Sequence, residues 1–155
     1  MNQQELHLLA TRFLNAWNTQ EVDQVLKCYT NDVLYRDPNT RGIVQGQENL
    51  SRYLKRLFEN WQMHWSLREG FPLQSKHGAA ILWQATFQKK ESPQVLEAEG
   101  MDLVLLEGDR IQRNEVYFDR ILLLPLMGVT GQLFHSFSKA TALFQRQVKK
   151  VKKWV

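Results

Sequence analysis

The sequence is poor in the residues that cross-link or disorder a chain. It has one cysteine, Cys28, so no disulfide can form within the chain, and a reducing, cytoplasmic location is expected. Only 8 glycines and 4 prolines occur among 155 residues, against 5 Trp, 4 Tyr and 8 Phe. This composition excludes collagen-like and low-complexity chains and indicates a compact fold with a proper core.

Long apolar runs and well-marked catalytic motifs are also missing. No apolar run approaches the roughly 18 residues of a membrane span, and Met1 leads into polar residues rather than a secretory signal. There is no glycine-rich phosphate loop, nucleophile elbow or cysteine pair. The histidines lack the spacing of a local metal site and are better explained as surface or helix-end residues: His7, His64, His77 and His135. We therefore expect no metal and no cofactor.

The first 61 residues show mainly helical spacing. Apolar residues recur at intervals of three and four in Glu5–Trp17, Glu21–Tyr29 and Gln47–Trp61, which predicts three amphipathic helices. Between the second and third, Val33–Asp37 is typical of a short strand that stops at Pro38, and residues 39–46 are expected to be a loop.

After Gln62 the apolar period changes to two. Strands are expected at Trp65–Leu73, Ala79–Phe87, Val95–Leu106 and Arg110–Asp119, with turns between them. Helices followed by an antiparallel meander predict an α+β fold, in which a curved antiparallel sheet wraps around the N-terminal helices as a cone.

We divide the chain into a domain at residues 1–128 and a C-terminal basic amphipathic helix at 129–155. Residues 146–155 hold five of the 20 Lys and Arg and no acid, so the rest of the chain is nearly neutral. In the simpler interpretation, this helix docks through its apolar side, and the basic residues lie at its C-terminal end because the helix dipole favours cations there. Weak contact with an anionic membrane or a partner is the other interpretation. Nucleic-acid binding is not expected, because no binding motif accompanies the basic residues.

Three aspartates occupy positions that favour a site. Asp102 interrupts a strand face of otherwise small or aliphatic residues, so it either accepts a structural Tyr or Trp hydrogen bond or serves a function. Asp37 ends a strand before Pro38, which is also typical of a simple turn. Asp119 ends the last strand beside Arg120, where a surface ion pair is the alternative. A cone could bring all three carboxylates to one cavity at its mouth.

The element order, the segments Phe13–Trp17 and Asn114–Asp119, and Asp37-Pro38 resemble the nuclear transport factor 2-like superfamily over about Leu6 to Gly128. Within it, the chain is similar to the SnoaL-like branch, which includes polyketide cyclases, and to ketosteroid isomerase. The resemblance implies a cone with a cavity. It does not fix an activity, because the same fold serves isomerases, cyclases, ligand carriers and interaction domains.

Residue by residue, the resemblance implies Asp37 as a general base and Asp102 as a hydrogen-bonding acid, as in ketosteroid isomerase, where an apolar site keeps a carboxylic acid neutral. Phe13 falls where that isomerase has its oxyanion tyrosine and cannot donate a hydrogen bond. Asp119 matches the acid/base aspartate of the cyclases, and Gly100 stands where related epoxide hydrolases have an arginine. The side chains expected to line the cavity are Phe13, Trp17, Tyr35, Trp61, Trp83, Tyr117 and Phe118.

Two functions stay open at this stage. In the first, the cavity binds a small apolar carbonyl compound, and the aspartates transfer a proton on it, as in an isomerase or cyclase. In the second, the protein binds a ligand or a partner without catalysis and forms a homodimer through its sheet.

Overall fold

The computed structural model describes residues 1–121 and 123 and confirms an α+β fold. The elements follow in the order α1 (Gln3–Thr19), α2 (Val22–Leu26), β1 (Tyr29–Arg36), β2 (Val44–Gln45), α3 (Gln47–Asn60), β3 (Trp61–Pro72), β4 (Gly78–Lys89), β5 (Val95–Glu107) and β6 (Arg110–Phe118). The basic helix expected at 129–155, and the boundary expected at residue 128, lie outside the described residues.

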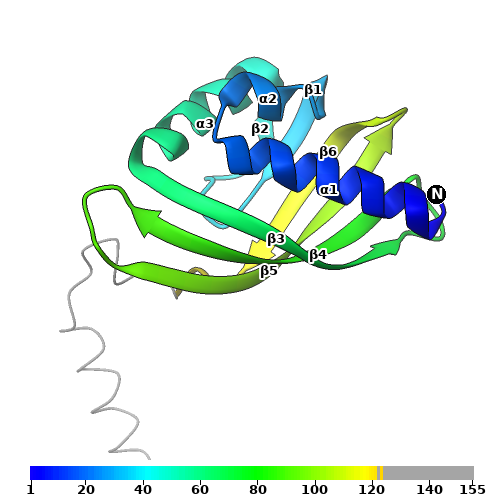
Figure 1. Cartoon of the computed structure of the whole chain (residues 1–155). Helices are drawn as coiled ribbons and strands as arrows, with labels where there is room; N and C mark the ends of the chain where they lie inside the picture. Colours follow the sequence, from blue (N-terminus) through cyan, green and yellow to red (C-terminus); the bar gives the residue numbers. More distant parts are fainter. Residues whose placement is uncertain (122, 124–155) are drawn as a thin grey trace, which may run out of the picture. The chain divides into compact units, whose positions relative to one another are not determined.

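The strands form one six-stranded sheet in the order β2-β1-β6-β5-β4-β3. Strands β3 to β6 make the expected antiparallel meander, and β1 extends the sheet by pairing parallel to β6. The sheet is long and curved, and α1 lies across its concave side, with α2 and α3 toward one end (Figure 1). This arrangement is the cone expected from the sequence.

Helix α1 is fixed at both ends by side-chain hydrogen bonds. At its start, Asn2 and Glu5 form a reciprocal capping box, each bonding the other's backbone N–H at 2.9 Å. At its end, the Asn18 amide pairs with both backbone groups of Trp65, donating at 2.8 Å and accepting at 2.7 Å. Gln20 makes similar bonds to β3. These amides satisfy free backbone groups of an edge strand and hold the C-terminal end of α1 against the sheet.

The structure corrects three local expectations. Tyr29 begins β1 instead of ending a helix, because it pairs with Ile111 of β6. The expected loop at 39–46 contains the short strand β2. Phe71 is exposed, although alternation from Trp65 predicts it on the inner face. A bulge at Arg68 shifts the register by one residue, so that Gly70 is buried there instead.

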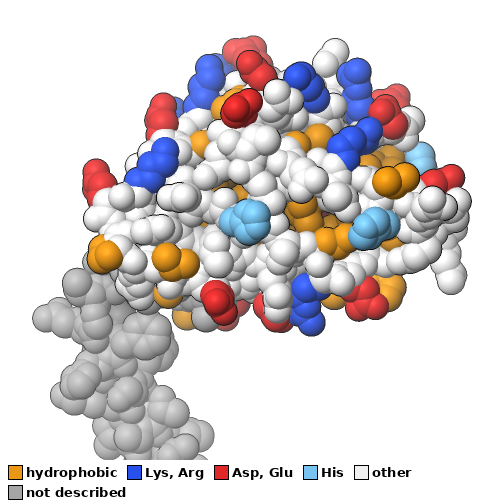
Figure 2. Space-filling view, in the orientation of Figure 1, with side chains coloured by type: hydrophobic (Ala, Val, Ile, Leu, Met, Phe, Trp, Pro, Cys, Tyr) orange, Lys and Arg blue, Asp and Glu red, His pale blue; other side chains and the backbone are white. Residues whose placement is uncertain are grey.

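Charged side chains of both signs are interspersed over the visible face of the described residues, without a large patch of one sign (Figure 2). Within residues 1–121 and 123, no helix has the length and apolar character needed to cross a membrane.

Candidate functional site

A cavity of about 50 Å³ lies on the concave side of the sheet, lined by residues of α1, α3, β1, β3, β4, β5 and β6 and of the turn after β1. This volume holds roughly three to five water-sized atoms. Eight of its fifteen lining residues are aromatic, and its two acidic residues are Asp37 and Asp102. The strand end carrying Asp37 and the middle of β5 are thus brought to one cavity, as expected from the cone.

Five of the seven expected ring residues line this cavity: Phe13, Trp17, Tyr35, Trp83 and Phe118. Trp61 and Tyr117 do not. Trp61 is the first residue of β3, and the next residue on the same face of the strand, Met63, lines the cavity instead. Tyr117 is 48% exposed, because side chains alternate along a strand and its neighbours Val116 and Phe118 both reach the cavity.

Asp37 is buried, and its carboxylate accepts four hydrogen bonds. Oδ1 accepts from the backbone N–H groups of Asn39 at 2.6 Å and Thr40 at 3.0 Å. Oδ2 accepts from the hydroxyls of Tyr35, at 2.8 Å, and Tyr53. The backbone bonds are those of the Asp-Pro turn expected from the sequence, so Asp37 both starts a turn and lines the cavity.

Asp102 has a different environment. It is 5% exposed, and Oδ2 accepts from the indole N–H of Trp83 at 3.1 Å. Within residues 1–121 and 123, no hydrogen bond of good geometry reaches its other oxygen, Oδ1. Burial raises the pKa of Asp102 to about 7; Trp83 and Asn114 lower it, and the nearby charge of Asp37 raises it further. Asp102 is therefore a cavity carboxyl that exists in both protonation states near neutral pH.

Gly100 makes room for the Trp83 ring that bonds to Asp102. The two residues are paired across β4 and β5, and a Cβ at position 100 would lie 2.4 Å from the ring and 2.7 Å from the Tyr117 carbonyl oxygen. The indole thus occupies the space of a side chain at position 100. An arginine there, as in the epoxide hydrolases of the resemblance, would displace Trp83.

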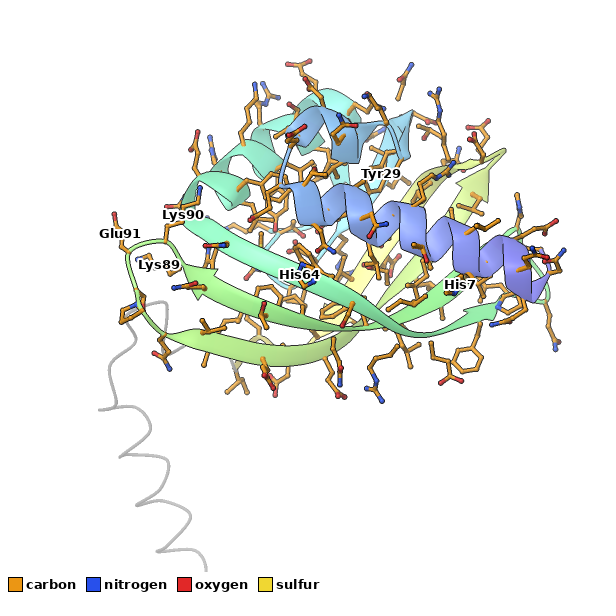
Figure 3. The ribbon with its side chains drawn as sticks, in the orientation of Figure 1. His7, Tyr29, His64, Lys89, Lys90 and Glu91 are labelled. Carbon is orange, nitrogen blue, oxygen red and sulfur yellow. The ribbon has the colours of Figure 1, made fainter. Side chains whose placement is uncertain are left out.

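A second polar cluster lies beside the cavity around Tyr29. Tyr29 is the first residue of β1 and is labelled beside α1 in Figure 3, and its side chain is fully buried. Its hydroxyl accepts from the Asn114 amide at 3.0 Å, and burial raises its pKa well above the usual range. Nε1 of Trp17 and Oδ1 of Asn114 are buried without a hydrogen-bond partner in the described part of the chain.

The sequence did not predict a role at the site for Tyr53 or Asn114. Tyr53 belongs to the apolar stripe of α3, where a hydroxyl among Leu50, Leu54 and Leu57 was the available signal. Asn114 is a polar residue at an inward position of β6, between Ile111 and Val116, as Asp102 is on β5.

Asp119 is exposed and is not among the cavity-lining residues that the structure describes. Its Oδ1 accepts from the backbone N–H of Ile121 at 2.8 Å, which caps the turn after β6. His7 and His64 project from α1 and β3 away from the core (Figure 3). No group of three metal-binding side chains is present within residues 1–121 and 123.

Comparison with protein families adds to this geometry. Residues 10–114, more than half of the chain, match the family described as the SnoaL-like domain. The protein belongs to the SnoaL-like family. The matched range begins in α1 and ends in β6, so it contains Asp37 and Asp102 but not Asp119. A comparison with curated proteins finds no match.

Solved structures share the fold at low sequence identity. A candidate isomerase from Bacillus subtilis aligns with a TM-score of 0.74 at 10% identity, over 84% of this chain and 98% of its own. A candidate polyketide cyclase from Silicibacter aligns at 0.65 and 16%, over 78% and 93%. A protein with a ketosteroid isomerase-like fold from Catenulispora acidiphila, solved with trimethylamine, aligns at 0.68 and 16%, over 76% and 89%. At these identities the comparison establishes the fold alone.

Proposed function

We propose that this SnoaL-like protein binds a small, largely apolar carbonyl compound in the cavity and that Asp102 moves a proton on it, as in an isomerase or cyclase. The observation that carries the proposal is a buried, cavity-lining carboxyl whose pKa is about 7. A general base or acid is most effective when its pKa lies near the working pH, and such transfer contributes about 10²–10⁴-fold in rate.

Asp102 is a better candidate for this proton than Asp37, which the family resemblance designates as the base. Four hydrogen-bond donors already occupy the Asp37 carboxyl group, and two of them are backbone N–H groups of its own turn, so this side chain is held as part of the framework. Asp102 has one donor of good geometry, from Trp83. Asp37 is then a positioning residue that holds the phenols of Tyr35 and Tyr53 at the cavity.

In the proposed step, ionised Asp102 removes a proton from the carbon next to the carbonyl group. The C–H bond breaks, an O–H bond forms on Asp102, and the electron pair moves onto the carbonyl oxygen. Return of the proton to the same or another carbon restores the carboxylate. Phe13 supplies no hydrogen bond to the developing oxyanion. Donors that line the cavity are the indole N–H of Trp17, which is unpartnered within the described residues, and, if one turns from Asp37 to the ligand, the phenols of Tyr35 and Tyr53.

The structural neighbours support a small ligand for this fold. Two are described as a candidate isomerase and a candidate polyketide cyclase, and a third was solved with trimethylamine. A molecule of that size is comparable with the cavity of about 50 Å³.

Exchange of α-hydrogens for deuterium tests the proton transfer without knowledge of the natural substrate. Acetone and butanone are incubated with the protein in D₂O and followed by proton NMR. We expect exchange above the buffer rate that Asp102→Asn abolishes. Glu97→Gln, which removes an exposed carboxylate from β5, should leave the rate unchanged. Exchange that survives Asp102→Asn and disappears in Asp119→Asn would move the role to Asp119.

The second candidate function is ligand binding or protein interaction without catalysis, by a homodimer formed through the outer face of the sheet. Two apolar rows cross that face: Phe71, Ala80 and Leu103 in one, and Leu82, Met101 and Tyr117 in the other. Phe71 and Tyr117 are each 48% exposed. Such a patch on an open sheet is typical of an interface.

Light scattering on the full chain tests the dimer. We expect twice the chain mass of 18.3 kDa, and a shift to the monomer in Met101→Lys. The conservative variant Met101→Leu should remain dimeric. A wild-type chain that is monomeric at all concentrations would remove this proposal.

Two more proposals rest on the sequence alone: a cytoplasmic location, and weak contact of residues 129–155 with anionic membranes. Deleting residues 146–155 should abolish binding to anionic vesicles, and binding that persists would contradict the second.

A further inference from the structure

The ionisable side chains that line the cavity are all acids or phenols. Asp37 and Asp102 lie there with Tyr35 and Tyr53, and no Lys, Arg or His is among the fifteen lining residues that the structure describes. Arg120, which follows β6, is exposed and donates to the Pro38 carbonyl at 3.2 Å. Among the residues that the structure describes, the cavity lining thus holds two carboxyl groups and no cation.

The salt bridges of the described residues do not involve either cavity acid; they join Arg12 with Asp109, Arg52 with Glu48, Arg68 with Glu99, and Arg113 with Glu115. Asp102 moreover is more than nine-tenths buried, and its polar neighbours in the described residues, Trp83 and Asn114, are both neutral. Burying an ionised carboxyl group is costly unless a charged partner compensates it, so a cation would stabilise ionised Asp102 in this cavity.

The remaining walls favour positive charge in a second way. Eight aromatic rings line the cavity, among them Trp17, Tyr35, Trp65 and Trp83. Aromatic faces carry negative partial charge and attract cations within about 6 Å of the ring, most strongly where water is excluded.

We propose that the occupant of this cavity is a small organic cation, of the size and chemistry of a methylated ammonium ion, or a molecule that carries such a group. The inference rests on the cavity of the proposed function but not on proton transfer. A single ligand that carries both an ammonium group and a carbonyl group would fit both proposals, because the ammonium group makes the C–H bond next to the carbonyl more acidic.

Cation binding should be linked to the ionisation of Asp102. The groups that face this carboxyl are Asp37 at the end of β1, Tyr29 and Tyr35 on β1, Trp83 on β4 and Asn114 on β6. The residues of α1 that line the cavity, Phe13, Leu14 and Trp17, do not titrate. The pKa values of both tyrosines are raised well above their usual range, so they stay neutral near pH 7. Asp102 is then the group whose charge changes there.

A permanent cation therefore binds more tightly as the pH rises through about 7, because the ionised carboxyl is the better partner. Between pH values near 6 and near 8, the ionised fraction of Asp102 rises about tenfold, and the affinity should rise by up to about the same factor.

Isothermal titration calorimetry with three probes of similar size tests the inference: tetramethylammonium as the cation, tert-butyl alcohol as its neutral isostere, and acetate as the anion. We expect tetramethylammonium to bind at least about tenfold more tightly than the other two near pH 8, and several-fold more weakly near pH 6. Asp102→Asn should reduce its affinity and remove the pH dependence. Glu97→Gln should behave as the wild type.

Equal affinity for tetramethylammonium and tert-butyl alcohol would overturn the inference, as would preferred binding of acetate or absence of tetramethylammonium binding up to millimolar concentration. Unchanged affinity in Asp102→Asn, with a native near-ultraviolet spectrum, would also overturn it. Tetramethylammonium binding without ketone exchange would refute the proposed proton transfer and support this inference. Exchange without cation binding would do the reverse.

Discussion

Replacing Asp102 by asparagine should make the protein more stable at neutral pH and less sensitive to pH. Burial raises the pKa of Asp102 from 3.8 to about 7, so between these values the folded protein holds a proton that the unfolded chain has released. Stability is therefore highest below about pH 4 for this group and falls as the pH rises to about 7. The difference of about three pH units corresponds to about 4 kcal/mol, at about 1.36 kcal/mol for each.

Urea unfolding of the wild type and Asp102→Asn near pH 5 and near pH 8 measures this contribution. The asparagine is always neutral and its amide oxygen can still accept from Trp83, so the variant keeps the 3.1 Å interaction. From pH 5 to pH 8 the wild type should lose about 2–3 kcal/mol relative to the variant. Stabilities that change in parallel over this range would refute the account of Asp102 as a buried carboxyl with a raised pKa.

Three further substitutions test the framework of the site. Asn18→Ala removes both hydrogen bonds to the edge of β3 and should lower the free energy of unfolding by about 1–3 kcal/mol, with Asn18→Asp less damaging if only one bond is lost. Gly100→Ala places a methyl group 2.4 Å from the Trp83 ring and should cost about 1–3 kcal/mol and shift the tryptophan fluorescence; an unchanged spectrum would contradict the packing. Tyr53→Phe removes a donor from the Asp37 carboxylate and should cost about 1.5–3 kcal/mol at pH 7, whereas in an Asp37→Asn background the cost should shrink.

Much of the fold could be predicted from the sequence, because hydrophobic period distinguishes the helices from the meander. The change of period after Gln62 corresponds to the observed start of β3 at Trp61. Local pattern does not carry information on pairing with distant strands. The helical spacing of Glu21–Tyr29 therefore does not reveal that Tyr29 lies on a strand that pairs parallel to β6. The alternation from Trp65 likewise does not reveal the bulge at Arg68 that turns Phe71 outward. Both features depend on pairing partners about 10 to 80 residues away.

The sequence predicts three misplaced carboxylates at one cavity, and two of them, Asp37 and Asp102, line the cavity of the structure. Their division of roles was not predictable, because it depends on donors from distant elements. Tyr53 of α3 reaches Asp37, and Trp83 of β4 reaches Asp102 only because Gly100 leaves it space. The cyclase-like Asp119 has no such partner set among the described residues and stays a sequence prediction.

Titration of Asp102 itself shows whether this residue is a proton-exchanging carboxyl group in the cavity. Carbon-13 NMR of aspartate-labelled protein, with the Asp102 signal assigned by its loss in Asp102→Asn, follows the carboxyl carbon as pH changes. We expect the titration of the Asp102 carboxyl carbon to have a midpoint near pH 7. A midpoint near 4, the value of an exposed aspartate, would contradict it.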